Sequence, residues 1–555
     1  MVKWQETISG SSTFILSVSS NFRMKKLPEF SISRYFILLS FVMAGCSGVQ
    51  FSSGNGKKLI TPDFMGKQIS YLASDSMKGR NTPSPQLDSA ASYIARNFKQ
   101  WGIEPWKGSF FQEVPICSDQ LGDSNELAII RNGASFQMTI KADYVPYDFS
   151  SAVSVTASVV FAGYGITAPD YKYDDYKGVE TKGKIVLIFR NEPQKDDSLS
   201  VFNGKDDSKY ISLKDKMKNA IQHGAAGMLV VNGPLQYSSV KARGYPWPSL
   251  SKVIPKDAVP LHLCIDREDQ IPVISIGEEV VNLLFGNVDS LKNLEARIEK
   301  DLSCVSFELP DTRISMHADI KTTTSIARNV AGYIRGSDPV LSKQLVIIGA
   351  HYDHVGYKKE HNNGEDYIYN GADDNASGTS GVMAVAHAFS SLKEKSKRSL
   401  MFILFAGEEK GLFGSRYYIS NPLYPLASTV AMLNLDMISR NNPDSLYLEG
   451  ASQSPDITNI IRRENKKTKF TLVVKDSDFL GGSDHYYFYK HNVPFMFFFT
   501  GLHKDYHQPG DNPDKSDFNK AARVSRLVFF TAGKIANEPT LYRIDPLEND
   551  APLGE

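Results

Sequence analysis

Histidine and acidic residues follow four apolar segments in the second half of this 555-residue sequence. The segments lie at 345–348, 400–405, 430–435 and 493–500, and the polar residues that follow them are His351, the pair Glu408 and Glu409, Asp436, and His507. Continuous apolar runs rich in branched side chains are typical of strands buried on both faces of a sheet. Ligands and catalytic groups collect at the carboxyl edge of such sheets. The pattern therefore predicts that these side chains meet at one edge.

The segment Gly371–Gly378, with the sequence GADDNASG, adds the adjacent carboxylates Asp373 and Asp374 directly before a helix-like run. Carboxylates gathered in one cleft repel one another in a low dielectric unless cations offset them. His, Asp and Glu without Cys suit a catalytic zinc site, although cobalt and manganese accept the same ligands. Three carboxylates with two histidines exceed the usual set for one catalytic zinc. They favour two ions about 3.5–4 Å apart that share a carboxylate.

The overall composition excludes some classes of partner. Lys plus Arg number 62 and Asp plus Glu number 62, so no net field favours nucleic acid or a strongly charged partner. Hydrophobic residues make up 41% of the chain, which is ample for packed cores. The length favours two to four globular domains.

The amino terminus has the pattern of an export signal. Lys25, Lys26 and Arg34 form a basic region, residues 35–43 are mostly apolar, and Ala44-Gly45-Cys46-Ser47 follows. This predicts a lipoprotein-type signal over 24–46, with a lipid anchor on Cys46 that holds the protein to the bacterial cell envelope. A buried apolar strand with an incidental cysteine is the alternative.

Three cysteines remain after Cys46, namely Cys117, Cys264 and Cys304. They allow at most one disulfide and leave one thiol over, so the sequence is neither a disulfide scaffold nor a cysteine-based metal site.

The predicted fold class is α/β, with a mixed, centrally parallel sheet sandwiched by helices and a smaller β-rich module inserted into it. Short glycine-rich β runs between 154 and 299 define the insertion, and no run there ends in acids and imidazoles. The catalytic domain would then be discontinuous, at 60–153 and 300–540. A linker at 47–59 precedes it and a loose tail at 541–555 follows it.

The motifs, taken in order, resemble the di-zinc exopeptidases, a family that includes bacterial leucyl aminopeptidase and glutamate carboxypeptidase II. The matching motifs are His351-Tyr352-Asp353, GADDNASG at 371–378, Glu408-Glu409 with Gly411, Asn434-Leu435-Asp436, and His507-Gln508-Pro509-Gly510-Asp511. The inserted segment resembles the protease-associated (PA) domain that many members carry.

The resemblance implies a role for each matching residue. Asp373 would bridge two zinc ions, His351 and Asp436 would complete one site, and Glu409 and His507 would complete the other. Glu408 would be the general base of peptide hydrolysis by a metal-bridged hydroxide. Asp353 would orient His351. Tyr506 matches a position where some relatives place a tyrosine that donates to the oxyanion.

The sequence is compatible with three functions. A zinc aminopeptidase that hydrolyses N-terminal residues from peptides is favoured, because a carboxypeptidase needs arginines for the C-terminal carboxylate and the ligand loops offer only Arg416 and Arg440. The second function is that of a metallocarboxypeptidase with the same two-zinc site. A non-catalytic, receptor-like peptide-binding module is the third, and would require ligands to be missing. His354 has no context of its own and is expected to play no part.

Overall fold

The computed structural model describes residues 54–545, except 203, 205–206, 253–258, 268–269 and 476–477. The signal expected at 24–46 and the lipid anchor expected at Cys46 lie outside the described residues and stay predictions from sequence. No helix in the described part of the chain is both long enough and apolar enough to cross a membrane.

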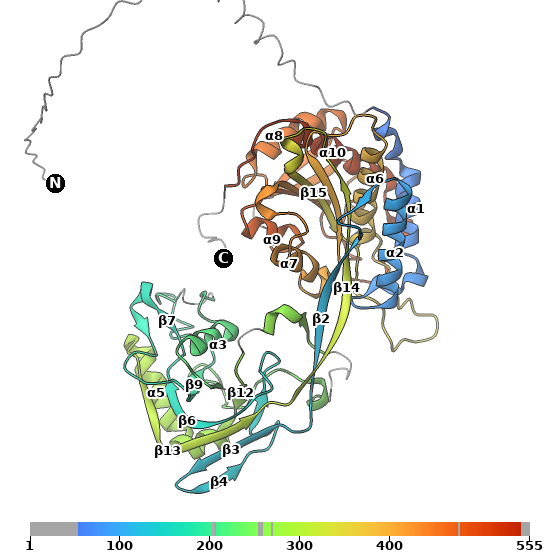
Figure 1. Ribbon diagram of the computed structural model, residues 1–555. Helices are drawn as coiled ribbons and strands as arrows, with labels where there is room; N and C mark the ends of the chain where they lie inside the picture. Colours follow the sequence, from blue (N-terminus) through green and yellow to red (C-terminus); the bar gives the residue numbers. More distant parts are fainter. Residues whose placement is uncertain are drawn as a thin grey trace, which may run out of the picture. The chain divides into compact units, whose positions relative to one another are not determined.

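A ten-stranded mixed sheet forms the larger core (Figure 1), in the order β11-β2-β14-β16-β15-β17-β20-β18-β19, with β1 paired to β14. Its strands are β1 (Glu104–Pro105), β2 (Phe111–Leu121), β11 (Leu261–Leu263), β14 (Ile320–Ile334), β15 (Leu345–His351), β16 (Ser399–Phe405), β17 (Thr429–Leu435), β18 (Ser445–Glu449), β19 (Thr471–Lys475) and β20 (Phe495–Phe499). The neighbours β16, β15, β17 and β20 run parallel. The four apolar segments of the sequence are these four strands, so their carboxyl ends share one edge as predicted.

Alternate side chains of the central strands enter two separate cores. In β15, Val346 and Ile348 belong to one core, whereas Leu345 and Ile347 belong to the other. A strand buried on both faces in this way reads as a continuous apolar run.

Helices cover both faces of this sheet. One face packs against α1 (Pro62–Leu72), α2 (Pro85–Gln100), α6 (Gly378–Ser390), α8 (Pro455–Glu464) and α10 (Phe518–Asn537), and the other against α7 (Phe413–Ser420) and α9 (His485–Lys490). The predicted fold class, a mixed and centrally parallel sheet between helices, is therefore confirmed.

An eight-stranded sheet forms the second core, in the order β4-β3-β13-β6-β9-β10-β12-β5. Its strands are β3 (Glu126–Arg131), β4 (Ala134–Gln137), β5 (Tyr144–Pro146), β6 (Ser154–Ala162), β9 (Ile185–Phe189), β10 (Gly227–Val231), β12 (Val273–Ile276) and β13 (Ser306–His317). Its helices are α3 (Leu213–Gln222), α4 (Glu278–Phe285) and α5 (Val288–Asp301). A two-stranded sheet of β7 (Thr167–Ala168) and β8 (Tyr173–Asp174) accompanies it.

The second sheet reaches beyond the segment 154–299 that the sequence suggested for the insertion. β3, β4 and β5 precede residue 154, and β13 follows residue 299. β2 leads the chain towards β3, and β13 leads back into β14, which pairs with β2 along most of its length. The composition changes only at β6, so it does not reveal the three earlier strands.

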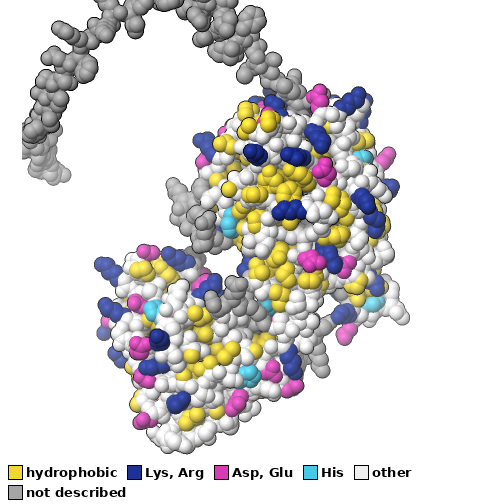
Figure 2. All heavy atoms as spheres, in the orientation of Figure 1, with side chains coloured by type: hydrophobic (Ala, Val, Ile, Leu, Met, Phe, Trp, Pro, Cys, Tyr) yellow, Lys and Arg dark blue, Asp and Glu magenta, His cyan; other side chains and the backbone are white. Residues whose placement is uncertain are grey.

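Two further sequence observations can be compared with the structure. Lys, Arg, Asp and Glu are interspersed over the visible face in Figure 2, in line with the balanced composition. In the segment 541–555, expected to be a loose tail, the ring centre of Tyr542 lies 5.8 Å from the guanidinium of Arg398, and the backbone N–H of Asp545 donates to the Gln453 carbonyl. Individual residues of the described part of that segment therefore contact the body of the chain, although Leu541 is exposed.

Cys117 and Cys264 form a disulfide, and Cys304 is free. The bridge joins β2 to the residue that follows β11 and closes a loop over a sequence separation of 147 residues. A cross-link across so long a loop removes entropy from the unfolded chain.

We expect the double variant Cys117→Ser, Cys264→Ser to unfold at a lower temperature, because removing a native disulfide costs about 2–4 kcal/mol. Thermal unfolding followed by circular dichroism would measure the change. Cys304→Ser is the matched control and should leave the transition in place. An unchanged transition in the double variant would contradict the stabilising role of the bridge.

Candidate metal centre

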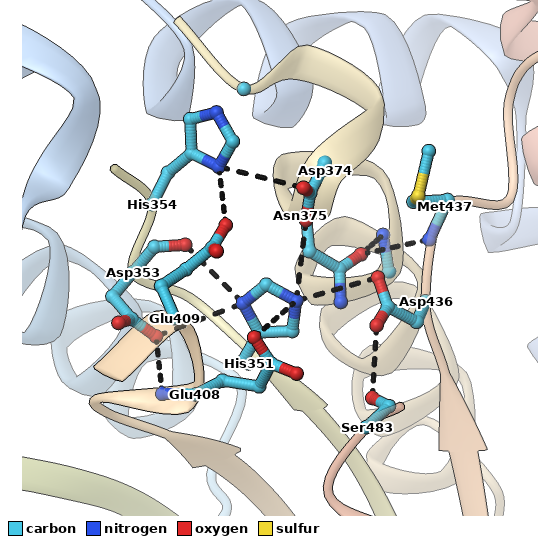
Figure 3. A network of polar contacts seen from close by, with 12 residues as sticks. His351, Asp353, His354, Asp374, Asn375, Glu408, Glu409, Asp436, Met437 and Ser483 are labelled. Carbon is cyan, nitrogen blue, oxygen red and sulfur yellow. Dashed lines mark hydrogen bonds and ion pairs between the residues drawn. The ribbon is translucent and has the colours of Figure 1, made fainter. Parts of the chain in front are cut away.

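The carboxyl edge of the parallel strands carries two groups of candidate metal ligands, most of which are labelled in Figure 3. One group is His351, Glu408 and Asp436, and the other is His354, Asp374, Glu409 and His507. Within each group the candidate ligand atoms all lie within 4.8 Å of one another. The side chains come from the ends of β15, β16 and β17, from the loop after β20, and from the irregular turn Ala372–Ser377 before α6. The sequence-based prediction that these strand ends converge is confirmed.

His351 is the centre of the first group. Its Nε2 lies 3.4 Å from Asp374 Oδ1, 3.4 Å from Asp436 Oδ1 and 3.9 Å from Glu408 Oε2. The ring is buried, at 1% exposure. Ser483 donates to Asp436 Oδ2 over 2.9 Å, which leaves Oδ1 of Asp436 to face the imidazole.

His507 and Glu409 define the second group. His507 Nε2 lies 3.1 Å from Asp374 Oδ2 and 3.0 Å from Glu409 Oε2. His354 Nδ1 lies 2.7 Å from the other oxygen of Glu409 and 3.7 Å from Asp374 Oδ2. Sequence reasoning missed His354. The available signal was its place three residues after His351 in the same loop.

Asp374, not Asp373, lies between the two groups. One oxygen of Asp374 faces His351 and the other faces His507. Asp373 Oδ1 instead accepts hydrogen bonds from the backbone and hydroxyl of Ser439, both at 2.7 Å, and its Oδ2 lies 3.4 Å from His503. The sequence-based choice of Asp373 as the bridging residue does not agree with this geometry.

The local backbone explains the difference between the two adjacent aspartates. Asp374 and Asn375 depart from helical φ and ψ inside the turn Ala372–Ser377, which sends the two carboxylates in different directions. The buried carboxylate of Asp511 accepts from the backbone N–H groups of both Asp373 and Asp374. Gly371 has a φ of 60°, and a Cβ there would collide with the Asp374 carbonyl and the His354 ring. The turn therefore requires glycine.

Asp353 lies behind His351, as the sequence predicted. The Nδ1 atom of His351 is 3.7 Å from the Asp353 carboxylate and 3.3 Å from the Asp353 carbonyl. Thr82 donates to this carboxylate over 2.8 Å, and the Glu408 backbone N–H donates over 3.2 Å. Asp353 therefore links the orientation of His351 to the position of Glu408.

Tyr506 stacks on the ring of His507, with centroids 3.9 Å apart and an interplanar angle of 22°. Its side chain is partly exposed, and burial together with the nearby carboxylates raises the pKa of its hydroxyl. Tyr506 thus contacts one of the candidate ligands.

The crowding of charges shifts the pKa of each group. Burial alone would lower the pKa of His351, but the charges of Asp436 and Glu408 outweigh burial and raise it. Burial likewise opposes protonation of His507, whereas the close carboxylates of Asp374 and Glu409 raise its pKa to about 10. Burial raises the pKa of Glu408, helped by Glu409 and Asp436. The imidazolium charges thus offset the carboxylates.

Several buried atoms of the centre have no hydrogen-bond partner in the described part of the chain, among them Asp374 Oδ2, Asp436 Oδ1 and His507 Nε2. Buried polar atoms without partners are rare in proteins and call for an explanation such as a bound ion. These orphaned atoms are nitrogen and oxygen donors that face one another across the two groups. The donor set fits divalent metal of the zinc type.

Residues 329–532 match the model of peptidase family M28, and residues 155–284 match the PA domain model. The chain contains a peptidase family M28 domain. The PA domain match precedes the M28 match in the sequence, and it confirms the resemblance predicted for this segment.

Individual relatives are more distant. Aminopeptidase YwaD of Bacillus subtilis is 28% identical over 378 residues, which cover 66% of each chain. A probable leucine aminopeptidase of Trichophyton verrucosum is 29% identical over 224 residues, 37% of this chain and 57% of that protein. The chain thus spans slightly less than two thirds of the first relative and a little over half of the second.

The solved structures that it resembles include an aminopeptidase from Aneurinibacillus sp. strain AM-1, with a TM-score of 0.47 and 21% identity over 90% of this chain and 99% of that one. Another is BSAP, a zinc aminopeptidase from Bacillus subtilis, with a TM-score of 0.44 and 20% identity over 88% of this chain and 99% of that one.

Arg80 fixes two loops of the M28 domain that carry the ligands. The fully buried guanidinium donates to the carbonyls of Leu72 and Tyr352, and to those of Asn370 and Gly371 at 2.9 and 3.0 Å. Its own carbonyl accepts from the His354 N–H. Burial lowers the pKa of Arg80 to about 10, with carboxylates of the centre opposing the shift, so it stays charged at neutral pH.

We expect Arg80→Lys to weaken zinc binding by more than about tenfold, because a single ammonium cannot reach all four carbonyls and each carbonyl left without a donor costs about 1–3 kcal/mol. Competition with a zinc indicator, well below the unfolding temperature of the variant, would measure the affinity. Arg96→Lys, on the exposed side of α2, is the control. If a folded Arg80→Lys protein bound zinc with unchanged affinity, Arg80 would stabilise the fold without positioning the metal ligands.

Proposed function

We propose that this protein is a zinc-dependent aminopeptidase that holds two zinc ions and hydrolyses N-terminal residues from peptides. One observation supports it above all: the two groups of candidate ligands meet at Asp374, and Glu408 of the first group has a carboxylate of raised pKa. A shared carboxylate and a neighbouring base suit metal-assisted hydrolysis.

In this proposal Asp374 would be shared by the ions. His351 and Asp436 would hold one ion, and Glu409 and His507 would hold the other. Bound zinc supplies Lewis acidity to the peptide carbonyl and lowers the pKa of water. His354 orients Glu409 through the 2.7 Å contact between Nδ1 and Oε1. Its role resembles that of the hydrogen-bonded groups behind other metal ligands.

Glu408 takes the proton from the attacking water and returns it to the leaving amine. Burial raises its pKa, which makes the carboxylate a stronger base than an exposed glutamate. Asp353 positions the backbone of Glu408, and it holds His351 from behind. Tyr506, stacked on His507 and partly open to solvent, is suited to donate its hydroxyl proton to the developing oxyanion.

The arginines near the centre favour the amino-terminal over the carboxy-terminal reaction. Arg440 lies 2.7 Å from Asp505 and 3.5 Å from Asp511, and Arg80 is enclosed by four carbonyls. These two guanidinium groups are engaged with the protein rather than with a substrate carboxylate. The names of the relatives, aminopeptidase YwaD and probable leucine aminopeptidase, favour the same reaction.

We expect leucine p-nitroanilide to be hydrolysed and its N-acetylated form to be left intact by a soluble form of the protein starting at Ser47. Chelation should abolish the activity and added zinc should restore it, since the ions carry the Lewis acidity. Release of p-nitroaniline gives the rate. Hydrolysis of the acetylated substrate, or activity that survives complete removal of metal, would refute the proposal.

Glu408→Gln is the matched control for that assay. Loss of a general base lowers kcat by about 10²–10⁴-fold, whereas zinc content should be unchanged if Glu408 acts on the water. A variant that loses zinc along with turnover would make Glu408 a ligand instead.

The adjacent aspartates provide a paired test of the bridging residue. We expect Asp374→Asn to bind fewer zinc ions than the wild type, because an amide cannot bridge two cations as a carboxylate does. Asp373→Asn should keep its zinc, since an amide oxygen still accepts from the Ser439 N–H. Zinc content by atomic absorption distinguishes the two, and the reverse result would return the bridging role to Asp373.

A further inference from the structure

The inserted PA domain contains an open cavity of about 680 Å³ that takes no part in the metal centre. Its wall is formed by residues 242–247, 250 and 251, by Val145 of β5 and by Lys141, Arg190 and Tyr237. Ligand sites in proteins commonly measure about 300–1,000 Å³, so the cavity is large enough for several atoms of a bound peptide.

The wall is held in place by buried contacts. Trp247 is 1% exposed, and its indole N–H donates to the Pro146 carbonyl over 2.8 Å. The Tyr245 N–H donates to the same carbonyl. The Arg243 N–H donates to Ser275 Oγ over 2.8 Å, and a side chain at Gly244 would collide with the backbone of β5. The cavity is therefore pre-formed and does not depend on a ligand for its shape.

Three cations line this cavity, namely Lys141, Arg190 and Arg243. Arg190 donates to the Arg243 carbonyl over 2.9 Å, and Lys141 donates to the Leu250 carbonyl over 2.5 Å. The guanidinium of Arg243 lies 5.6 Å from the centre of the Tyr237 ring. Among the residues that the structure describes, no carboxylate forms an ion pair with any of the three.

Aromatic side chains supply the rest of the surface. Tyr237 is fixed by a 3.0 Å hydrogen bond to Asn191 Oδ1, and Tyr245 packs edge-on against Trp247 with ring centroids 5.0 Å apart. Both tyrosines are half-buried and line the cavity. Guanidinium groups bind carboxylates through paired hydrogen bonds, and tyrosine rings add apolar contact area.

We infer that this cavity binds an acidic segment of a peptide, with glutamate or aspartate carboxylates against Arg190 and Arg243 and an apolar side chain against Tyr237 and Tyr245. Charge complementarity selects an acidic ligand, and the aromatic wall selects a peptide over a bare anion. The binding itself does not require the metal centre. The statement that the bound peptide is a substrate rests on the proposed aminopeptidase function.

Binding is tested with the full zinc-loaded protein and a fluorescent peptide of alternating glutamate and phenylalanine, acetylated at its amino terminus so that it is not consumed. The same peptide with glutamine in place of glutamate is the matched ligand. Fluorescence anisotropy should give a Kd at least about tenfold lower for the glutamate peptide, since each charge-assisted pair contributes more than a neutral hydrogen bond.

The double variant Arg190→Gln, Arg243→Gln should weaken binding of the glutamate peptide by at least about tenfold. Arg297→Gln, Lys300→Gln makes the same charge change at exposed positions of α5 in the same domain, and should leave the Kd unchanged. If both double variants lost the same amount of affinity, the effect would come from the overall charge of the domain, and the proposed binding site would be wrong. Equal Kd values for the two peptides would overturn it as well.

Charge reversal keeps the test valid if the double variant disturbs the loop. Arg243→Glu leaves the backbone contacts of the wall and the Arg190 side chain unchanged. It should weaken binding of the glutamate peptide and strengthen binding of an analogue with lysine in place of glutamate. Inorganic phosphate distinguishes a bare anion site from a peptide site. If phosphate displaced the glutamate peptide at concentrations near the peptide's own Kd, the peptide assignment would be wrong.

A kinetic measurement connects the cavity to the proposed function. For long peptides with free amino termini and acidic residues beyond the first few positions, Arg243→Glu should raise KM and leave kcat unchanged, because it removes binding and not chemistry. Leucine p-nitroanilide is too short to reach a second site and should be hydrolysed as by the wild type. If no substrate is hydrolysed, the aminopeptidase proposal fails, whereas the anisotropy experiment still decides the binding site.

Discussion

The concentration of like charge at one buried sheet edge is the constraint on which the rest of the M28 domain depends. Asp374 and Asp436 are buried and Glu409 is largely buried, and three imidazoles lie within 4 Å of these carboxylates. Isolated carboxylates so placed would take up protons or repel the loops that carry them. The carboxylates raise the pKa of His351 and that of His507, so these two imidazoles are suited to offset part of the negative charge. Divalent ions would replace those protons, so metal binding and proton release are coupled.

The same constraint accounts for groups that lie outside the ligand set. Arg80 donates its hydrogen bonds to backbone carbonyls and pairs with no single carboxylate among the described residues. Its positive charge therefore acts on several carboxylates of the centre, while its hydrogen bonds hold the backbone of the ligand loops. Asp511 accepts the N–H groups of the turn that presents Asp374. Ser483 occupies one oxygen of Asp436 and leaves the other to face His351. A ligand set of this charge is thus positioned by backbone contacts more than by the ligands themselves.

The sequence predicted the strands well and the orientation of side chains less well. β15, β16, β17 and β20 were predictable because a strand buried on both faces must be apolar at every position. The choice between Asp373 and Asp374 as the bridging residue was not predictable. Both are acidic, and their side chains point in different directions only because the backbone of Asp374 departs from helical φ and ψ. His354 was missed for a related reason: its role depends on a contact with Glu409, which is 55 residues away in the sequence. β3, β4 and β5 lie in sequence that carries no change of composition, so their place in the second sheet could not be predicted.

The metal centre and the cavity of the PA domain carry charges of opposite sign. The metal centre gathers carboxylates and therefore requires cations, whereas the cavity of the PA domain presents Arg190 and Arg243, with which no described carboxylate forms an ion pair. Both arrangements rest on rigid backbone, the first on an irregular turn held by Asp511 and the second on a loop held by Trp247. A group held in place before its partner arrives loses little entropy on binding, which favours specificity over adaptability. The cationic cavity is therefore built for a narrow class of acidic ligands, and a second anchoring point of this kind would let the chain select among peptides by residues remote from the bond that is cleaved.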